Sequence, residues 1–106
     1  MSLRDEILNK KPPTQGVIIP QWNCTLYLRP MSAKDKLSLL KGIDAMDNLT
    51  FQCAVIARCL VDEAGVRVFA DEDTEALMQK EVSVLEQLYS LIDEQSKTLK
   101  DTLKKN

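Results

Sequence analysis

The spacing of apolar residues near the N-terminus changes from helical to extended. Ser2 and Asp5 have the spacing of a capping box, so residues 1–10 are expected to hold a short helix that ends before Pro12-Pro13. Residues 15–29 predict two strands around a tight connection at Pro20-Gln21. In the second strand apolar and polar positions alternate: Trp22, Cys24, Leu26 and Leu28 against Asn23, Thr25, Tyr27 and Arg29. The alternation predicts a two-stranded β-ribbon with an apolar face that another element must cover.

From residue 32 to 95 the pattern becomes helical. Ser32 and Asp35 form a second capping-box match, and the helix that follows is expected to bury Leu37, Leu40 and Ile43. A break is expected at residues 44–48. Residues 49–61 are then apolar on nearly every side, which is typical of a buried central helix, with Arg58 reaching out at its rim.

A polar turn follows the central helix. Residues 62–65 should end it, with Gly65 in the positive-φ conformation, and residues 66–69 should be a short extended piece. Asp71 is the expected cap of the next helix, which bends around residues 80–83 and carries a long apolar stripe. We expect residues 96–106 to fray. The sequence thus predicts a mainly α, single small helical domain over residues 1–106, with an N-terminal two-stranded β-ribbon (α+β).

Composition removes several classes of partner. The 106 residues carry a net charge of −2 with 14 basic and 16 acidic residues, and no basic stripe suggests nucleic acid. No apolar run has the length of a membrane span, so we expect a soluble, intracellular protein that does not bind membranes. Cys24, Cys53 and Cys59 lack metal-type spacing, and we expect them to be small buried residues in a reducing compartment.

The residues that catalysis would need are missing or scattered. The chain has no histidine, which excludes Ser-His and Cys-His nucleophile pairs and His-containing metal sites. Its three glycines are too dispersed for a phosphate-binding loop. The acidic residues between Asp62 and Glu75 do not follow the calcium-loop pattern, and a capped helix start explains them better than a metal site. We therefore expect no enzyme activity, no cofactor and no metal.

Protein contact remains as the expected activity. The candidate contact residues are Trp22, Tyr27, Phe51 and Phe69, each an aromatic anchor for a partner or a cap on the core. Core packing is the better interpretation for Trp22 and Phe69, whereas Tyr27, on the polar face of its strand, is the best candidate for contact. The ribbon also has an open edge that another chain could extend.

The order of these parts resembles a known family. An opening of Met1-Ser2-Leu3-Arg4-Asp5-Glu6-Ile7-Leu8 precedes a ribbon with Trp22 and Tyr27 and a helix start at Ser32-Ala33. An apolar helix then ends in Leu60-Val61-Asp62-Glu63, followed by Gly65, Phe69 and an Asp71-Glu72-Asp73 helix with Leu77 and Lys80. Over about ninety residues this order and spacing resemble the tail assembly chaperones of long-tailed, siphophage-type bacteriophages.

The resemblance implies a function without catalysis. It implies a mostly helical, non-enzymatic chaperone that binds the tape-measure protein and keeps it soluble for tail-tube polymerisation. The tail-tube protein and further copies of the chain are the other implied partners. Such a protein acts in the host bacterial cytoplasm and is not part of the mature virion. Lys104-Lys105-Asn106 could also be encoded by an A-rich slippery run for a frameshifted longer product. The alternative is a small intracellular helical adaptor or regulatory module unrelated to tails.

Overall fold

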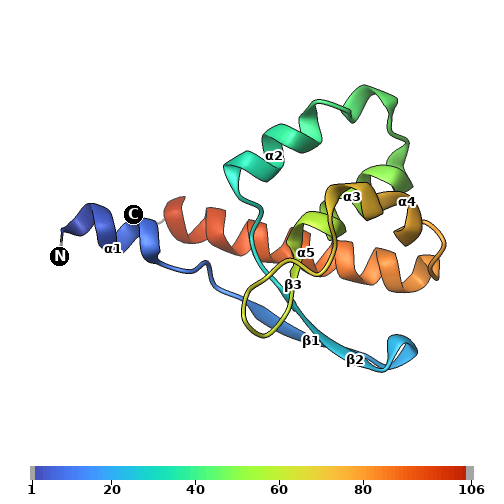
Figure 1. Ribbon diagram of the computed structural model, residues 1–106, viewed down its shortest axis with the longest axis horizontal. Coiled ribbons are helices and arrows are strands. Elements are labelled where there is room, and N and C mark those ends of the chain that lie inside the picture. The colour runs from blue at the N-terminus through green and yellow to red at the C-terminus, as the bar shows by residue number, and fades with distance from the viewer. Residues whose placement is uncertain (1, 105–106) are drawn as a thin grey trace.

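A computed structural model describes the backbone of residues 2–104 and their side chains except those of Ala45 and residues 98–104 (Figure 1). Three short 3₁₀ turns, η1 (Pro20–Trp22), η2 (Ile43–Ala45) and η3 (Asp71–Asp73), interrupt the chain. The strands are β1 (Gln15–Ile19), β2 (Cys24–Leu28) and β3 (Leu60–Val61), and the helices are α1 (Leu3–Asn9), α2 (Ala33–Leu40), α3 (Asn48–Cys59), α4 (Thr74–Leu77) and α5 (Val82–Lys104). The predicted mainly α fold class with a small β element is confirmed.

The sheet has one strand more than the predicted ribbon. β1 and β2 form an antiparallel hairpin through η1, and β3 pairs with β2 on its other side, giving the order β1-β2-β3. The helix expected to run to Val61 ends instead at Cys59, because the backbone of Leu60 and Val61 bonds to β2. A short apolar run fits a buried strand as well as a helix, so its pattern could not separate the two.

Local signals at the helix starts and at the turn after β3 are confirmed. The hydroxyl oxygens of Ser2 and Ser32 accept hydrogen bonds from the amides of Asp5 and Asp35, at 3.2 and 3.1 Å. The break between α2 and α3 lies where the polar residues predicted it, and Asp47 caps α3. Gly65 has the expected positive φ of 85°.

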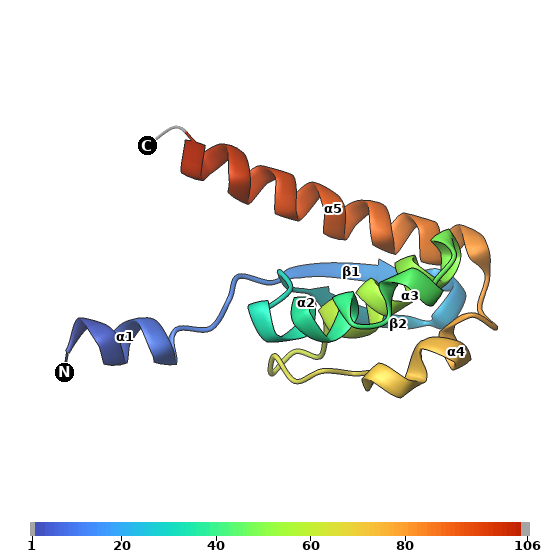
Figure 2. The ribbon, with the colours of Figure 1, turned by 90° about the horizontal axis from the view of Figure 1, so that it is seen from above.

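Helix α3 is the centre of the molecule. All seven residues from Cys53 to Cys59 are buried, and α3 packs against both α5 and α4 (Figure 2). The long helix α5 covers it with the buried residues Val84, Leu85, Leu88 and Ile92. The predicted bend separates α4 from α5. Helix α5 continues to Lys104, through most of the segment from residue 96 that was predicted to fray; its side chains from residue 98 onward, and the whole of Lys105-Asn106, lie outside the described residues.

Arg58 does not reach the rim as predicted but is buried, with 5% of its surface exposed. Its guanidinium donates hydrogen bonds to the Ala54 carbonyl at 2.9 Å and the Ser38 hydroxyl at 3.1 Å, and lies 3.4 Å from an Asp71 carboxylate oxygen. Asp71 in turn is not the predicted helix cap, because its other oxygen accepts from Arg67 at 2.8 Å. The pair with Asp71 and the two hydrogen bonds compensate the burial of the Arg58 charge.

Two further charged groups join these residues to the hairpin. Asp35 accepts from Arg29 at 2.9 Å, and Arg29 also donates to the Arg58 carbonyl at 3.1 Å. We call Arg29, Asp35, Arg58, Arg67 and Asp71 the arginine network. The network fixes α2, α3, the end of β2 and the loop before α4 relative to one another. Fully solvated side chains could not hold these elements together.

The arginine network also explains why α2 buries a different side than predicted. Asp35, Ser38 and Leu39 lie on one face of this helix, and the network holds that face against α3. Leu39 is therefore 3% exposed, while the residues expected inside remain accessible: Leu37 at 63%, Leu40 at 45% and Ile43 at 37%.

Candidate partner-binding surface

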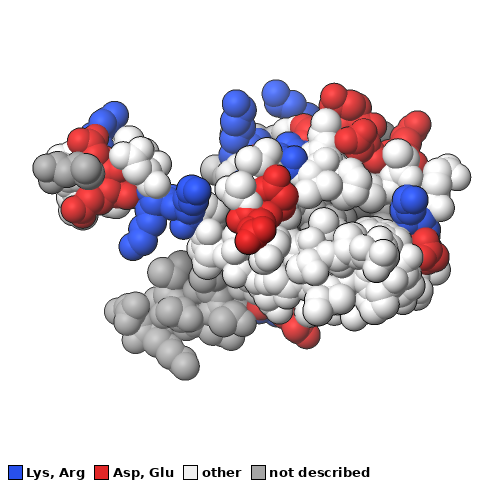
Figure 3. Space-filling model, turned by 60° about the horizontal axis from the view of Figure 1, so that its bottom comes forward, with Lys and Arg blue, Asp and Glu red and all other residues white. Residues whose placement is uncertain are grey.

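The β1–β2 hairpin presents a surface without formal charge. No Asp, Glu, Lys or Arg occurs from Pro12 to Leu28, although such residues make up 28% of the chain. In Figure 3 the hairpin and α5 form a broad face with few charged side chains, and most charges lie around its edge. Depletion of charge is a compositional feature of the buried centres of protein interfaces.

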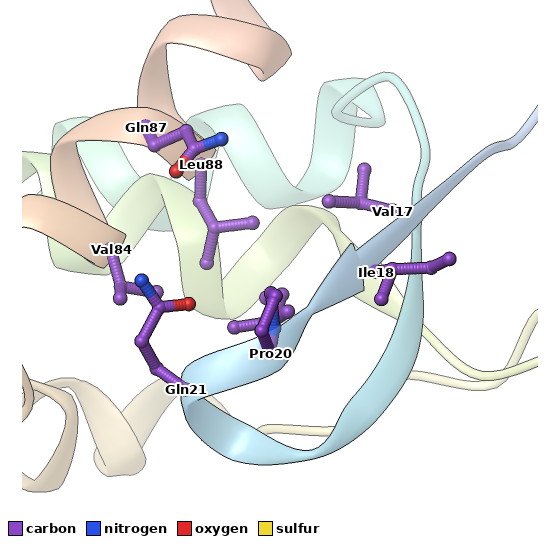
Figure 4. A pocket seen from close by; sticks show the side chains of 8 residues that line it. Val17, Ile18, Pro20, Gln21, Val84, Gln87 and Leu88 are labelled. Carbon is purple, nitrogen blue, oxygen red and sulfur yellow. The ribbon is translucent and has the colours of Figure 1, made fainter.

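A pocket of about 210 Å³ opens between β1 and α5 (Figure 4). Val84 and Leu88 approach it from α5, whereas Ile18 of β1 lies on the side away from the helix. None of its lining residues is charged: Val17, Ile18, Ile19, Pro20, Gln21, Val84, Gln87 and Leu88. We call this set the hairpin–α5 face. It can bury apolar groups of a partner, and the amides of Gln21 and Gln87 can pair with polar ones.

Strand β1 adds an edge to this face. It pairs with β2 on one side, and on its other side the described residues supply no further strand. Ile18 at the middle of β1 is 75% exposed. An edge with free backbone groups and an exposed apolar side chain is open to pairing with another chain.

Tyr27, the best aromatic candidate, lies across the hairpin from Gly16. Its ring carbon is 3.3 Å from the position that a Cβ on Gly16 would take, so the ring covers the glycine on the outer side of the sheet. The side chain is partly exposed and accessible to a partner. Whether Tyr27 contacts one remains a prediction.

The other three aromatic candidates do not join Tyr27 in one patch. Trp22, Phe51 and Phe69 are partly buried and pack against the core from η1, α3 and the loop before α4. Phe51 packs edge to face with Tyr89, with ring centroids 6.3 Å apart. Trp22 was expected in the second strand but lies in η1, at the tip of the hairpin. Of these three, Trp22 is the nearest in the chain to the hairpin–α5 face.

A second, larger depression lies between α2, α3 and α5. It has a cavity volume of about 460 Å³ and a mostly apolar lining, with Lys36 and Asp93 among the residues at its edge. Leu40 and Ile43, two of the unexpectedly accessible residues, form part of its wall. We call this depression the α2–α3–α5 groove; its lining is Pro30, Met31, Lys36, Leu39, Leu40, Ile43, Phe51, Val55, Asp93 and Ser96.

Several acidic side chains around the loop from Asp62 to Asp73 have structural partners. The hydrogen bond from Arg67, followed by that from Ser38, holds the pKa of Asp71 below its ordinary value despite partial burial. The Asp62 carboxylate accepts from the amides of Ala64 and Val66, and the Asp73 carboxylate accepts from the amide of Ala70. In the described part of the chain, no group of three or more acidic or cysteine residues is placed to hold a metal ion.

The cysteines differ in exposure. Burial raises the pKa of the Cys59 thiol to about 11 and also raises that of Cys53, so both are poor nucleophiles. Cys24 was expected to be buried but is exposed on the hairpin. Among residues 2–104, no helix is long and apolar enough to span a bilayer.

Sequence reasoning missed the hairpin–α5 face because it searched for aromatic anchors. The sequence does contain one indication of this face, the absence of charged residues from Pro12 to Leu28. It is a property of the whole segment and cannot be seen at any single residue. The contribution of α5 had no local signal, since Val84 and Leu88 belong to the stripe that also forms the core.

Comparison with known proteins identifies a solved structure with a similar fold. No family model and no curated protein matches the sequence. Among solved structures, the fold is similar to that of the bacteriophage HK97 tail assembly chaperone, with a TM-score of 0.63 and 17% sequence identity. The match covers 84% of this chain and 92% of the phage chain. The resemblance predicted from the sequence is thus confirmed for the fold: this chain has the fold of a phage tail assembly chaperone.

Proposed function

We propose that this chain is a non-enzymatic phage tail assembly chaperone. It binds the tape-measure protein through the hairpin–α5 face and keeps it soluble until tail-tube subunits polymerise around it. The protein acts in the cytoplasm of the host bacterium and leaves before the virion is complete. The observation that carries the proposal is the fold shared with the HK97 chaperone over 84% of this chain and 92% of the other.

The hairpin–α5 face supports the proposal because its chemistry suits a client of low solubility. Its pocket is lined by uncharged residues, and Ile18 is an accessible apolar side chain at 75%. A long helical client exposes apolar stripes that repeat along its length. Several chaperones bound along one client would hold it with high avidity, even if each single contact is weak.

The test is co-expression with the tape-measure protein encoded near this gene. We expect the client to be soluble and to co-purify with this chain, and to precipitate without it. Ile18→Asp should lower the affinity for the client at least about tenfold, because it places a charge on the exposed edge strand that borders the pocket. The matched control is Gln79→Asp, which adds the same charge at an exposed position after α4.

Three outcomes contradict the proposal. A client equally soluble with and without this chain would remove the chaperone role. Capture of a regulatory protein, with no affinity for the tape-measure protein, would instead favour the adaptor. Equal loss of affinity in both charge variants would show that the hairpin–α5 face is not the binding surface.

A further inference from the structure

The hydrogen bonds of β2 show which backbone groups of the hairpin face outward. The amide of Arg29, the residue after β2, donates to the Cys59 carbonyl at 2.9 Å, toward β3. In an antiparallel sheet the backbone groups of successive residues point to opposite sides of the strand. Those of Leu28, the residue before, therefore point to β1, where its partner is Gln15.

The same alternation leaves two residues of β1 with their backbone groups at the outer edge. The groups of Gln15 and Val17 are directed toward β2, so the N–H and C=O groups of Gly16 and Ile18 point away from it. Among the described residues, no strand pairs with that side of β1. The outer edge of the hairpin therefore offers two donors and two acceptors in line.

Prolines limit this edge. The next outward position after Ile18 is Pro20, which has no N–H and begins η1, and Pro12-Pro13 precede the strand. An added strand can thus pair over only a few residues. Proline beside an exposed edge also restricts the extension of a sheet from molecule to molecule. The edge therefore suits a short, reversible contact and not a long shared sheet.

These backbone groups fit an extended segment and not a helix. A helix bonds its own N–H and C=O groups internally, so it would leave those of Gly16 and Ile18 without partners. A chain in the β conformation presents its own groups at the matching spacing. Strand addition to an exposed edge is a common mode of peptide recognition, in which main-chain bonds provide affinity and pockets for alternate side chains provide specificity.

The pocket between β1 and α5 defines the side chains of that segment. Side chains of an added strand alternate between the two faces of the sheet. Those on the inner face, where Val17 and Ile19 lie, would enter the pocket toward Leu88 of α5 (Figure 4). No charged residue lines the pocket, so a charged side chain there would lose its hydration without gaining a partner. The inward residues of the segment must therefore be uncharged and mainly apolar.

We propose that the client binds as a short strand added to the outer edge of β1. The bound segment is an extended, non-helical stretch of the tape-measure protein with uncharged, apolar residues at alternate positions. Its backbone pairs with Gly16 and Ile18, and its inward side chains fill the pocket between β1 and α5. The inference rests on the proposed function, and it adds how the client is held and which kind of segment is recognised.

Ile18→Pro tests the outward hydrogen bonds. Proline removes the N–H of residue 18, but this group lies outside the ladder with β2, so the hairpin should be retained. Affinity for the co-expressed tape-measure protein should fall at least about tenfold, whereas Ile18→Ala keeps the N–H and should lose no more than about threefold. Glu63→Pro is the matched control and should retain the client, because this exposed residue lies at the second position of a turn, where proline is favoured. Far-UV circular dichroism shows that each variant is folded.

Residue-resolved amide exchange of the unsubstituted chain gives a readout that needs no variant. In the free chain the amides of Gly16 and Ile18 should exchange faster than those of Val17 and Ile19, which bond to β2. In the complex with the tape-measure protein, the Gly16 and Ile18 amides should exchange at least about tenfold more slowly. Contact through side chains alone would leave these two amides fast.

Overlapping peptides that cover the tape-measure sequence identify the segment. We expect binding of uncharged peptides with apolar residues at every second position, and competition between these peptides and the full client. Binding confined to peptides whose apolar residues are three and four apart would contradict strand addition, since that spacing is helical.

Three further results would overturn the proposal. A folded Ile18→Pro variant with the affinity of Ile18→Ala would show that the N–H is not used. Gly16 and Ile18 amides that stay fast in the complex would show the same without any substitution. Slow exchange of these amides in the free chain would mean that the edge is already occupied. In each case a client that stays soluble and bound leaves the chaperone role intact, whereas a client that does not bind removes both.

Discussion

The arginine network and the hairpin–α5 face use charge in opposite ways. In the network, five charged side chains join α2, α3, the end of β2 and the loop before α4, and Arg58 among them is 5% exposed. On the hairpin–α5 face, the lining of the pocket has no charged residue. In the arginine network, paired charges fix the packing of the elements that carry them. On the hairpin–α5 face, the absence of charge lets a partner cover the surface without desolvating ions. Changes in the first region should therefore alter stability, and changes in the second should alter binding.

The largest effect is expected at the centre of the arginine network. Arg58→Ala should lower the free energy of unfolding by about 2–5 kcal/mol, because it removes the hydrogen bonds to Ala54 and Ser38 and the pair with Asp71, and opens a void beside α3. Urea denaturation provides the measurement. Arg4→Ala breaks the exposed pair with Asp5, whose side chains are 77% and 47% accessible, and should change stability by less than about 1 kcal/mol. Equal effects of the two substitutions would contradict the comparison.

A smaller effect is expected at Asp71. Asp71→Asn should cost about 1–2 kcal/mol at neutral pH, less than a fully buried pair because this side chain is 40% exposed. The pKa of Asp71 is lowered in the folded state, chiefly by the hydrogen bond from Arg67. Its contribution is therefore complete well above the ordinary pKa of 3.8 and is lost as the pH falls through the lowered folded value.

The pH dependence gives Asp71 a second readout. The wild-type protein should lose more stability on acidification from neutral pH than Asp71→Asn does, because the amide cannot titrate. Denaturation at a series of pH values compares the two slopes. Parallel slopes would mean that Asp71 titrates in the same way in the folded and unfolded chains.

Substitution of Gly65, in the turn after β3, should have a moderate effect on stability. Gly65→Ala is expected to cost about 1 kcal/mol, since its φ of 85° lies in the left-handed region, where L-residues are strained. No atom lies within 4 Å of the added Cβ, so the cost comes from the backbone and not from a clash. Gly16→Ala is the comparison, because there the added Cβ would contact the Tyr27 ring at 3.3 Å instead. An unchanged midpoint for Gly65→Ala would contradict this assignment.

Chemical labelling of Cys24 should have the smallest effect on stability, and the order in which the three thiols react is the quantity measured. This thiol is exposed on the hairpin, while burial raises the pKa values of Cys53 and Cys59. A maleimide reagent should therefore label Cys24 first without unfolding the protein. Bound client should slow that reaction if it covers the hairpin. Mass spectrometry of the labelled peptides identifies the site, and preferential labelling of Cys59 would contradict the burial of α3.

Local signals predicted much of the fold. Capping pairs at Ser2 and Ser32 and the glycine at position 65 act through neighbouring backbone groups, so short sequence spacing is enough to find them. The third strand and the arginine network could not be predicted in this way. Arg58 meets Ser38 and Asp71 from distant parts of the chain, and Leu60-Val61 became a strand because β2 offered free backbone groups. The same long-range packing reversed the exposed side of α2.

Amide hydrogen exchange of the chain with and without the tape-measure protein tests the central claim most directly. The account predicts slower exchange over residues 17–21 and 84–88, which contain the hairpin–α5 face, and unchanged exchange at the Glu63–Gly65 turn. Slower exchange confined to other elements, or an identical pattern in the bound and free chain, would contradict it.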